Sequence, residues 1–148
     1  MHLRHYRPEG MLRSVDVLRS RQFDMWVRNL VEKARDGDVV AFATAKYVSD
    51  QITYLRGLTR PPNLEDETAT LKWVRQSRRY QLWRLSHPYD GLVAARLIVW
   101  FDDEHNTAVI ALFAGDKARI GDAFYASVGT RGDQVVDLWK AERMREGQ

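Results

Sequence analysis

The chain has 148 residues, of which 45% are hydrophobic and 29% charged, and it contains no cysteine. This balance is typical of a single globular domain with a hydrophobic core, and the lack of cysteine excludes disulfides and thiolate metal sites. The net charge of +3 permits nucleic-acid binding without requiring it. No apolar stretch approaches the roughly 18 residues that a membrane span needs. Residues 1–10 also lack the apolar core of a signal peptide, so we expect a cytoplasmic protein.

The first half of the domain is predicted to be a strand followed by two helices. Residues 1–13 are expected to form a flexible basic arm, and residues 14–148 a single domain. Apolar and polar residues alternate over 14–20, which favours a short strand. A helix over 21–36 is predicted from one apolar stripe, formed by Phe23, Trp26, Val27, Leu30, Val31 and Ala34. A second helix over 39–56 follows a short break, so the two form an antiparallel hairpin.

The second half of the chain changes to a strand pattern. Strands are predicted over 80–86, 93–101 and 108–114, because these stretches are alternating or continuously apolar and are separated by turn residues. Their short connections predict an antiparallel meander.

The remaining segments complete an α+β fold. A polar link over 57–70 joins the two halves, a short helix is predicted over 69–77, and a C-terminal helix over 131–145. We therefore expect a small antiparallel sheet with the helical hairpin packed on one face and a C-terminal helix.

Cationic residues on the predicted strands are the main functional signal. The face of strand 93–101 that is expected to meet the helices is unbroken and carries Val93, Ala95, Leu97, Val99 and Phe101. Arg96 then lies on the other face, which has little sequence left to cover it, and Arg84 is expected on the same face of the neighbouring strand. Lys117 and Arg119 follow the third strand, and Tyr125 comes from the turn or helix after it. The alternative is that each arginine pairs with a carboxylate or covers apolar surface with its stem.

If these cations converge, the chemistry they suit is phosphodiester cleavage. Guanidinium groups bind phosphate bidentately and stay charged at every working pH. RNA carries its own nucleophile, the 2′-OH, so cleavage needs a base, cations for the developing charge and an acid for the leaving oxygen. A tyrosine could stack on a base or assist proton transfer. No metal is required.

Other catalytic patterns are weaker. The four histidines show no ligand spacing with carboxylates. The run Asp102, Asp103, Glu104 and His105 is interpreted as a solvated turn rather than a metal site. Neither a G-x-S-x-G motif nor a P-loop occurs. We expect no metal and no other cofactor.

Residues 14–126 resemble the RelE/HigB-like toxins of bacterial type II toxin–antitoxin systems, which belong to the RelE/ParE superfamily. The resemblance is carried by "FDMWVRNLVEKA" in the helical hairpin, then by "YQLWRLS", "ARLIVWF" and "AVIALFAGDKA" in the three strands. Three features depart from the family pattern. Alanine stands where a tyrosine is usual before the arginine of the second strand. Asp-Lys stands where a Lys-Lys pair is common, and the helix over 131–145 continues beyond the usual end.

The resemblance implies a role for each candidate residue. Arg84 and Arg96 would hold or stabilise the scissile phosphate, and Lys117 would act as base or electrostatic support. Tyr125 would stack on or orient a nucleotide. Contacts to RNA are further implied for Arg119 and Asp116, although Asp116 could instead cap the following helix.

The resemblance also implies a biological role and partners. The chain would be a metal-independent endoribonuclease that cleaves mRNA on the ribosome, with a cognate antitoxin protein as its second partner. Two alternatives stay open, because ParE-type toxins share this fold and inhibit DNA gyrase without an RNase site. The chain could be such an inhibitor, or an inactive copy that only binds its antitoxin.

Overall fold

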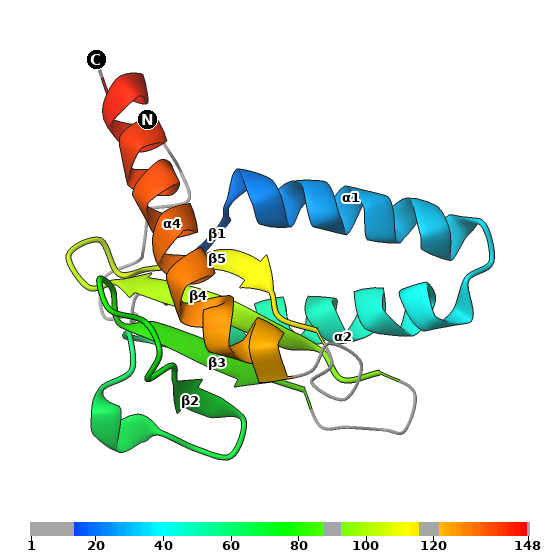
Figure 1. The fold of residues 1–148 in the computed structure, drawn as a ribbon, viewed down its shortest axis with the longest axis horizontal. Coiled ribbons are helices and arrows are strands. Elements are labelled where there is room, and N and C mark those ends of the chain that lie inside the picture. Colours follow the sequence, from blue (N-terminus) through cyan, green and yellow to red (C-terminus); the bar gives the residue numbers. More distant parts are fainter. Residues whose placement is uncertain (1–13, 88–92, 116–121, 148) are drawn as a thin grey trace.

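The fold is an α+β arrangement around one five-stranded sheet (Figure 1). The structure is a computed structural model that describes residues 14–87, 93–115 and 122–147, with no side chains described for 122–126. Three α-helices, one short 3₁₀-helix and five strands lie within these ranges. The coarse α+β class predicted from the sequence is therefore confirmed.

The sheet is mixed, so the expectation of a purely antiparallel sheet was wrong. Its strand order is β1-β5-β4-β3-β2, in which β2 (Leu71–Trp73) is the edge strand next to β3. β3 (Leu82–Ser86), β4 (Arg96–Asp102) and β5 (Thr107–Phe113) form the predicted antiparallel meander. β1 (Asp16–Arg19) instead pairs in parallel with β5, the last of the described strands. Strand pairing of this kind joins segments far apart in sequence, and no local pattern reveals it.

The two helices after β1 form the predicted hairpin. α1 (Arg21–Arg35) begins at the buried Ser20, whose hydroxyl accepts a hydrogen bond from the Phe23 amide (3.0 Å). The same hydroxyl donates to the carbonyl oxygen of Ala111 (2.6 Å), so this cap also fixes the helix to β5. α2 (Val39–Arg56) begins at Asp38, whose carboxylate accepts from the Ala41 amide (3.0 Å). Side-chain caps of this kind satisfy amides that helix geometry leaves unpaired.

The hairpin covers one face of the sheet, as predicted. Its buried contacts with the strands are made by one apolar cluster, which includes Phe23, Val48, Leu55, Trp83, Leu85, Leu97, Val99 and Phe101. In β5 a bulge opposite Ile98 and Val99 inserts Ala111 as an extra residue. Ile110 consequently packs on the hairpin side whereas Leu112 packs on the other side, because an inserted residue reverses the alternation of side chains.

The opposite face is covered by α4 (Asp122–Glu146), which corrects two expectations. The C-terminal helix begins nine residues before the predicted start, and the strand face expected to be open carries a second core cluster. This cluster includes Leu82, Ile98, Leu112, Val128, Val135 and Val136. Two glycines permit the close approach: a Cβ at Gly129 would lie 2.4 Å from the Gln76 backbone, and one at Gly132 would lie 2.5 Å from Leu82 Cδ1.

A second set of contacts fixes α4 to the connection between β2 and β3. The buried Asp133 carboxylate accepts hydrogen bonds from the amides of Arg78 (2.9 Å), Arg79 (3.1 Å) and Tyr80 (3.2 Å). One turn later, Asp137 accepts from the Tyr80 hydroxyl (2.6 Å) and pairs with Arg79. The hydrogen bond to Asp137 raises the pKa of Tyr80, and burial acts in the same direction.

The predicted helix over 69–77 was wrong, because this segment contains a strand. After the 3₁₀-helix Leu64–Asp66, β2 (Leu71–Trp73) pairs antiparallel with β3 and forms the other edge of the sheet. Leu71 is buried while Lys72 is exposed, which is the alternation of an edge strand. Within the described ranges, no helix has the length and apolarity that crossing a membrane requires.

Candidate nucleic-acid interface

Three cationic side chains lie on one face of three neighbouring strands, and we call them the cationic row: Lys72, Arg84 and Arg96. Lys72 of β2 is the cross-strand partner of Arg84 in β3. Ser86, two residues after Arg84, is the partner of Arg96 in β4. Cross-strand partners, and residues two apart on one strand, share a face. The prediction that Arg84 and Arg96 lie on the same face of neighbouring strands is therefore confirmed, although α4 covers part of that face.

Arg96 is the first residue of β4, at the end of the sheet where β5 terminates. It is half-buried, and its guanidinium donates to the carbonyl oxygen of Gly115 (3.3 Å). Gly115 adopts a φ of +77°, a conformation that side chains disfavour, so a glycine suits this turn. The segment "DKARIG" follows directly. This hydrogen bond uses one of the N–H donors of Arg96. No carboxylate in the described part of the chain forms an ion pair with Arg96.

Arg84 is also half-buried and lines a small cavity of about 160 Å³. The other lining residues include Lys72, Trp73, Arg75, Ile98 and Val128. Its Nε atom is buried and finds no hydrogen-bond acceptor among the described residues. A buried donor without an acceptor is uncommon and calls for a physical reason. No described carboxylate forms an ion pair with Arg84, so packing holds its guanidinium in place. An anion that binds there would therefore displace no described carboxylate.

Lys72 completes the row and was missed by the sequence analysis, which placed it in a helix. Its side chain is exposed on the edge strand. The Glu67 carboxylate interacts with this end of the row. It accepts a hydrogen bond from the Trp73 amide (2.9 Å), which lowers the pKa of Glu67. The charges of Arg75 and Lys72 add to that lowering. Glu67 is therefore ionised at neutral pH and offsets part of the positive charge at the β2 end of the row.

The remaining predicted site residues cannot be placed with the row. Asp116, Lys117 and Arg119 lie outside the described residues, and their roles stay predictions. Tyr125 lies within α4, in the stretch of that helix for which no side chains are described. Of the four residues predicted to be catalytic, the structure therefore places Arg84 and Arg96 on one face of neighbouring strands.

A separate cluster of possible ligands lies in the turn between β4 and β5. Asp102, Glu104 and His105 can each offer one ligand atom, and these atoms lie within 4.8 Å of one another. His105 Nδ1 lies 2.7 Å from Asp102 Oδ2, and both Glu104 and His105 are exposed. The sequence interpretation of this stretch as a turn is confirmed, and its geometry points to no particular cation.

The arrangement suits the binding of a chain of phosphates. Neighbouring strands are about 4.8 Å apart, so the row spans roughly 10 Å across β2, β3 and β4. Cations at such spacing can contact successive phosphates, and arginine can do so through two parallel hydrogen bonds. Guanidinium groups would also stabilise the charge that develops on a phosphate under attack.

Comparisons of the chain with protein-family models, curated proteins and solved structures found no match.

Proposed function

We propose that this chain is the toxin of a type II toxin–antitoxin system, with a fold and an activity similar to those of the RelE/HigB toxins. It would cleave mRNA on translating ribosomes without a metal and be neutralised by a cognate antitoxin. The observation that carries the proposal is the pair of Arg84 and Arg96 on one face of adjacent strands, without a carboxylate partner in the described residues. The order of strand, helical hairpin and three-stranded meander agrees with the order that the resemblance implies.

The proposed chemistry assigns the arginines to the phosphate. Arg84 and Arg96 bind the scissile phosphate and stabilise its negative charge as the 2′-OH attacks the phosphorus, the bond to the 5′ oxygen breaks and that oxygen takes up a proton from water. Lys117 supplies the base or further charge stabilisation, and Tyr125 stacks on or orients a nucleotide. Arg119 and Asp116 contact the RNA beside the cleaved bond. Lys72 would bind a neighbouring phosphate at the edge of the sheet.

The position of α4 favours a second candidate, a non-enzymatic toxin. This helix packs over the strand face that carries the row, with Val128 against the cavity beside Arg84, and it reduces the area open to RNA. A ParE-like inhibitor of DNA gyrase, or an inactive copy that only binds its antitoxin, needs no open face there.

Growth and RNA cleavage in bacterial cells separate these candidates. We expect induction of the wild-type chain to arrest growth and to produce new 5′ ends within messages. The double variant Arg84→Ala and Arg96→Ala should give neither, while Lys33→Ala, which removes an exposed cation of α1, should behave as wild type. Arrest by the double variant as well, with purified gyrase inhibited, would overturn the ribonuclease proposal and support the gyrase inhibitor.

A further inference from the structure

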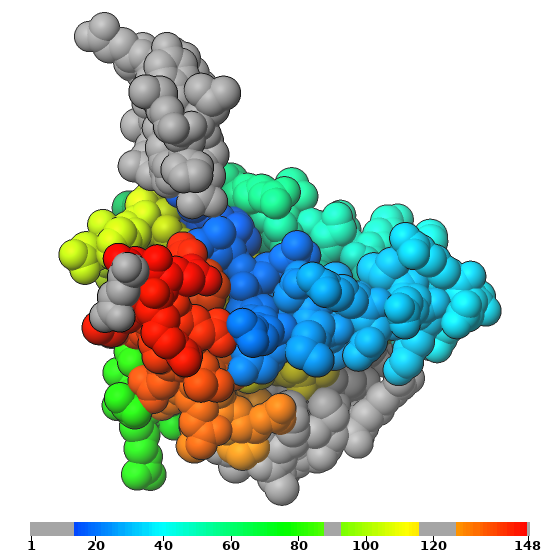
Figure 2. All heavy atoms as spheres, turned by 90° about the horizontal axis from the view of Figure 1, so that it is seen from above, coloured from blue at the N-terminus to red at the C-terminus, as the bar shows by residue number. Residues whose placement is uncertain are grey.

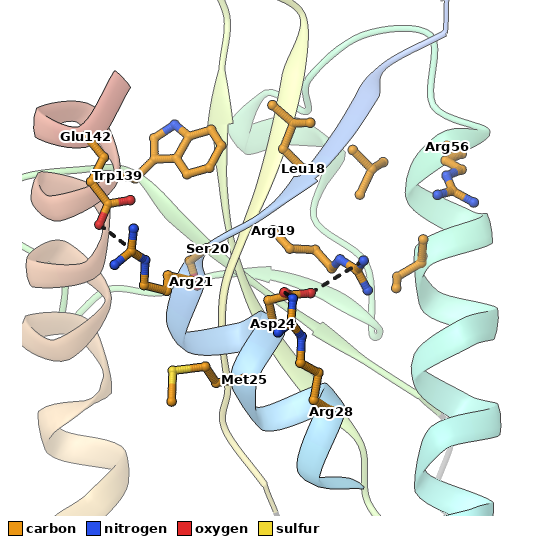
Figure 3. Close-up of a pocket in the computed structure, with 12 residues that line it drawn as sticks. Leu18, Arg19, Ser20, Arg21, Asp24, Met25, Arg28, Arg56, Trp139 and Glu142 are labelled. Carbon is orange, nitrogen blue, oxygen red and sulfur yellow. Dashed lines mark ion pairs between the residues drawn. The ribbon is translucent and has the colours of Figure 1, made fainter. Parts of the chain in front are cut away.

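A groove of about 770 Å³ lies at the β1 edge of the sheet, opposite the edge formed by β2. Figure 3 shows β1 along its floor, α2 on one side, α4 on the other and the first turns of α1 at its end. Figure 2 shows α4 beside the start of α1, where Arg21 Nε lies 3.8 Å from Glu142 Oε1. The volume of the groove is within the range of ligand-binding pockets. The cationic row lies on other strands, so this groove is a separate surface.

The floor of the groove is an open strand edge. Asp16 and Ser20 donate their amides to carbonyls at β5, namely those of Asn106 (3.1 Å) and Ile110 (2.9 Å). Alternate residues of a strand face the same neighbour, so Val15, Val17 and Arg19 present their backbone groups to the outer side. The Val15 amide is satisfied by the Leu58 carbonyl (2.7 Å). No described strand pairs with the rest of this edge.

The walls of the groove carry an excess of positive charge. Four arginines and two carboxylates line it, which leaves an excess of two positive charges: Arg19, Arg21, Arg28 and Arg56 against Asp24 and Glu142. Asp24 is shared by Arg19 (3.5 Å) and Arg28 (3.0 Å). Arg56 of α2 has no ion pair with any described residue and is exposed. Arg19 reaches from β1 toward the α2 side of the groove (Figure 3).

Apolar side chains lie between these charges. Val17 and Ile52 line the α2 side, whereas Leu18 and Trp139 line the α4 side. Met25 of α1, whose exposed fraction is 59%, lies at the end of the groove. A ligand that fits must therefore alternate between apolar and negatively charged groups while pairing with a strand edge.

We propose that this groove binds an extended acidic peptide segment of a partner protein, which adds a strand along the outer edge of β1. Backbone hydrogen bonds to Val17 and Arg19 would give affinity, and carboxylates reaching Arg19 and Arg56 would give specificity. Successive side chains of a strand point to opposite sides, so the apolar residues of the peptide would face the α4 side and contact Leu18 and Trp139. This inference does not depend on the ribonuclease activity.

The charge of the groove also selects against two other occupants. Residues 1–13 carry three arginines and one glutamate, so the chain's own first segment would bring like charge to the groove. A second copy of this chain would have to pair β1 with β1 and would bring the same four arginines together. Like charges placed opposite each other are destabilising.

Fluorescence anisotropy with synthetic peptides tests the proposal on the full chain. The probe is a labelled eight-residue peptide that alternates glutamate with valine, and the first control replaces each glutamate by glutamine. We expect the acidic peptide to bind at least tenfold more tightly than the glutamine peptide. Arg56→Glu should weaken its binding by about tenfold. The matched control Lys46→Glu, which reverses an exposed charge of α2 outside the groove, should change binding by less than about twofold.

A second peptide tests the strand pairing itself. Methylation of every second backbone nitrogen of the acidic peptide removes donors for β1 while the charge is unchanged, so binding should weaken at least tenfold. Equal binding of the methylated and unmethylated peptides would overturn strand addition, and equal binding of the acidic and glutamine peptides would overturn charge recognition. Absence of binding up to about 1 mM would overturn the whole proposal. Circular dichroism of each variant confirms that it is folded.

Discussion

At the residue scale, the period of two in the strands was the most informative feature of the sequence. It correctly placed Arg84 and Arg96 on one face and the apolar residues of β4 against the helical hairpin. Lys72 was not found, because a three-residue strand is too short to show a period. The buried Asp133 was not found either, since its partners are backbone amides more than fifty residues away.

Asp133 is the residue on which we expect the attachment of α4 to depend most. Its carboxylate accepts three backbone hydrogen bonds while almost fully buried. Asp133→Asn replaces one acceptor oxygen by a donor that faces these amides. We expect the free energy of unfolding to fall by about 2 kcal/mol, measured by urea denaturation.

The control for this prediction is Asp103→Asn in the exposed turn between β4 and β5. This change should be nearly neutral, because an exposed carboxylate loses little when it is replaced. Equal and small effects of both changes would show that the Asp133 contacts contribute nothing measurable to stability.

At the element scale, the helical hairpin and the meander could be predicted from local patterns, while the extent of α4 could not. Glycines at 129 and 132 weaken the helical signal over the first half of α4, because glycine is a poor helix former. The structure shows why glycine is present: Gly132 allows α4 to approach β3 closely, and Gly129 allows it to approach the segment before β3. Because the first half of α4 was not predicted, the strand face that it covers was expected to be open.

We expect Gly129→Ala to destabilise the protein although alanine is the better helix former. On propensity alone the change would stabilise the helix by about 1 kcal/mol. The new Cβ would lie 2.4 Å from backbone atoms of Gln76 and Ser77, which cannot move aside as a flexible side chain can. We therefore expect a net loss of about 1–3 kcal/mol in the free energy of unfolding.

Thr130→Ala is the matched control, because Thr130 is the next residue of the helix and is exposed. It should be neutral or slightly stabilising in the same urea titration, since alanine has the higher propensity. A stabilised Gly129→Ala variant would contradict the close docking of α4 on the segment before β3.

At the scale of the whole molecule, two layers of helices enclose one sheet, and cationic side chains lie at both edges of that sheet. The β2 edge carries the exposed end of the cationic row, and the β1 edge carries the arginine-lined groove. The fold class followed from the sequence because it depends on local periods. The parallel pairing of β1 with β5 did not, because β1 and β5 are separated by the hairpin, β2, β3 and β4 in the chain.

The most direct test of the central claim is the rate of message cleavage in a reconstituted translation reaction with the purified chain. We expect the wild type to cut the message and Arg84→Ala or Arg96→Ala each to slow cutting by roughly 10²–10³, while Lys33→Ala cuts at the wild-type rate. The same message without ribosomes measures how far cleavage depends on them. Cleavage by both arginine variants at the wild-type rate, or no cleavage by the folded wild type, would contradict the assignment of the cationic row as an RNA-cleaving site.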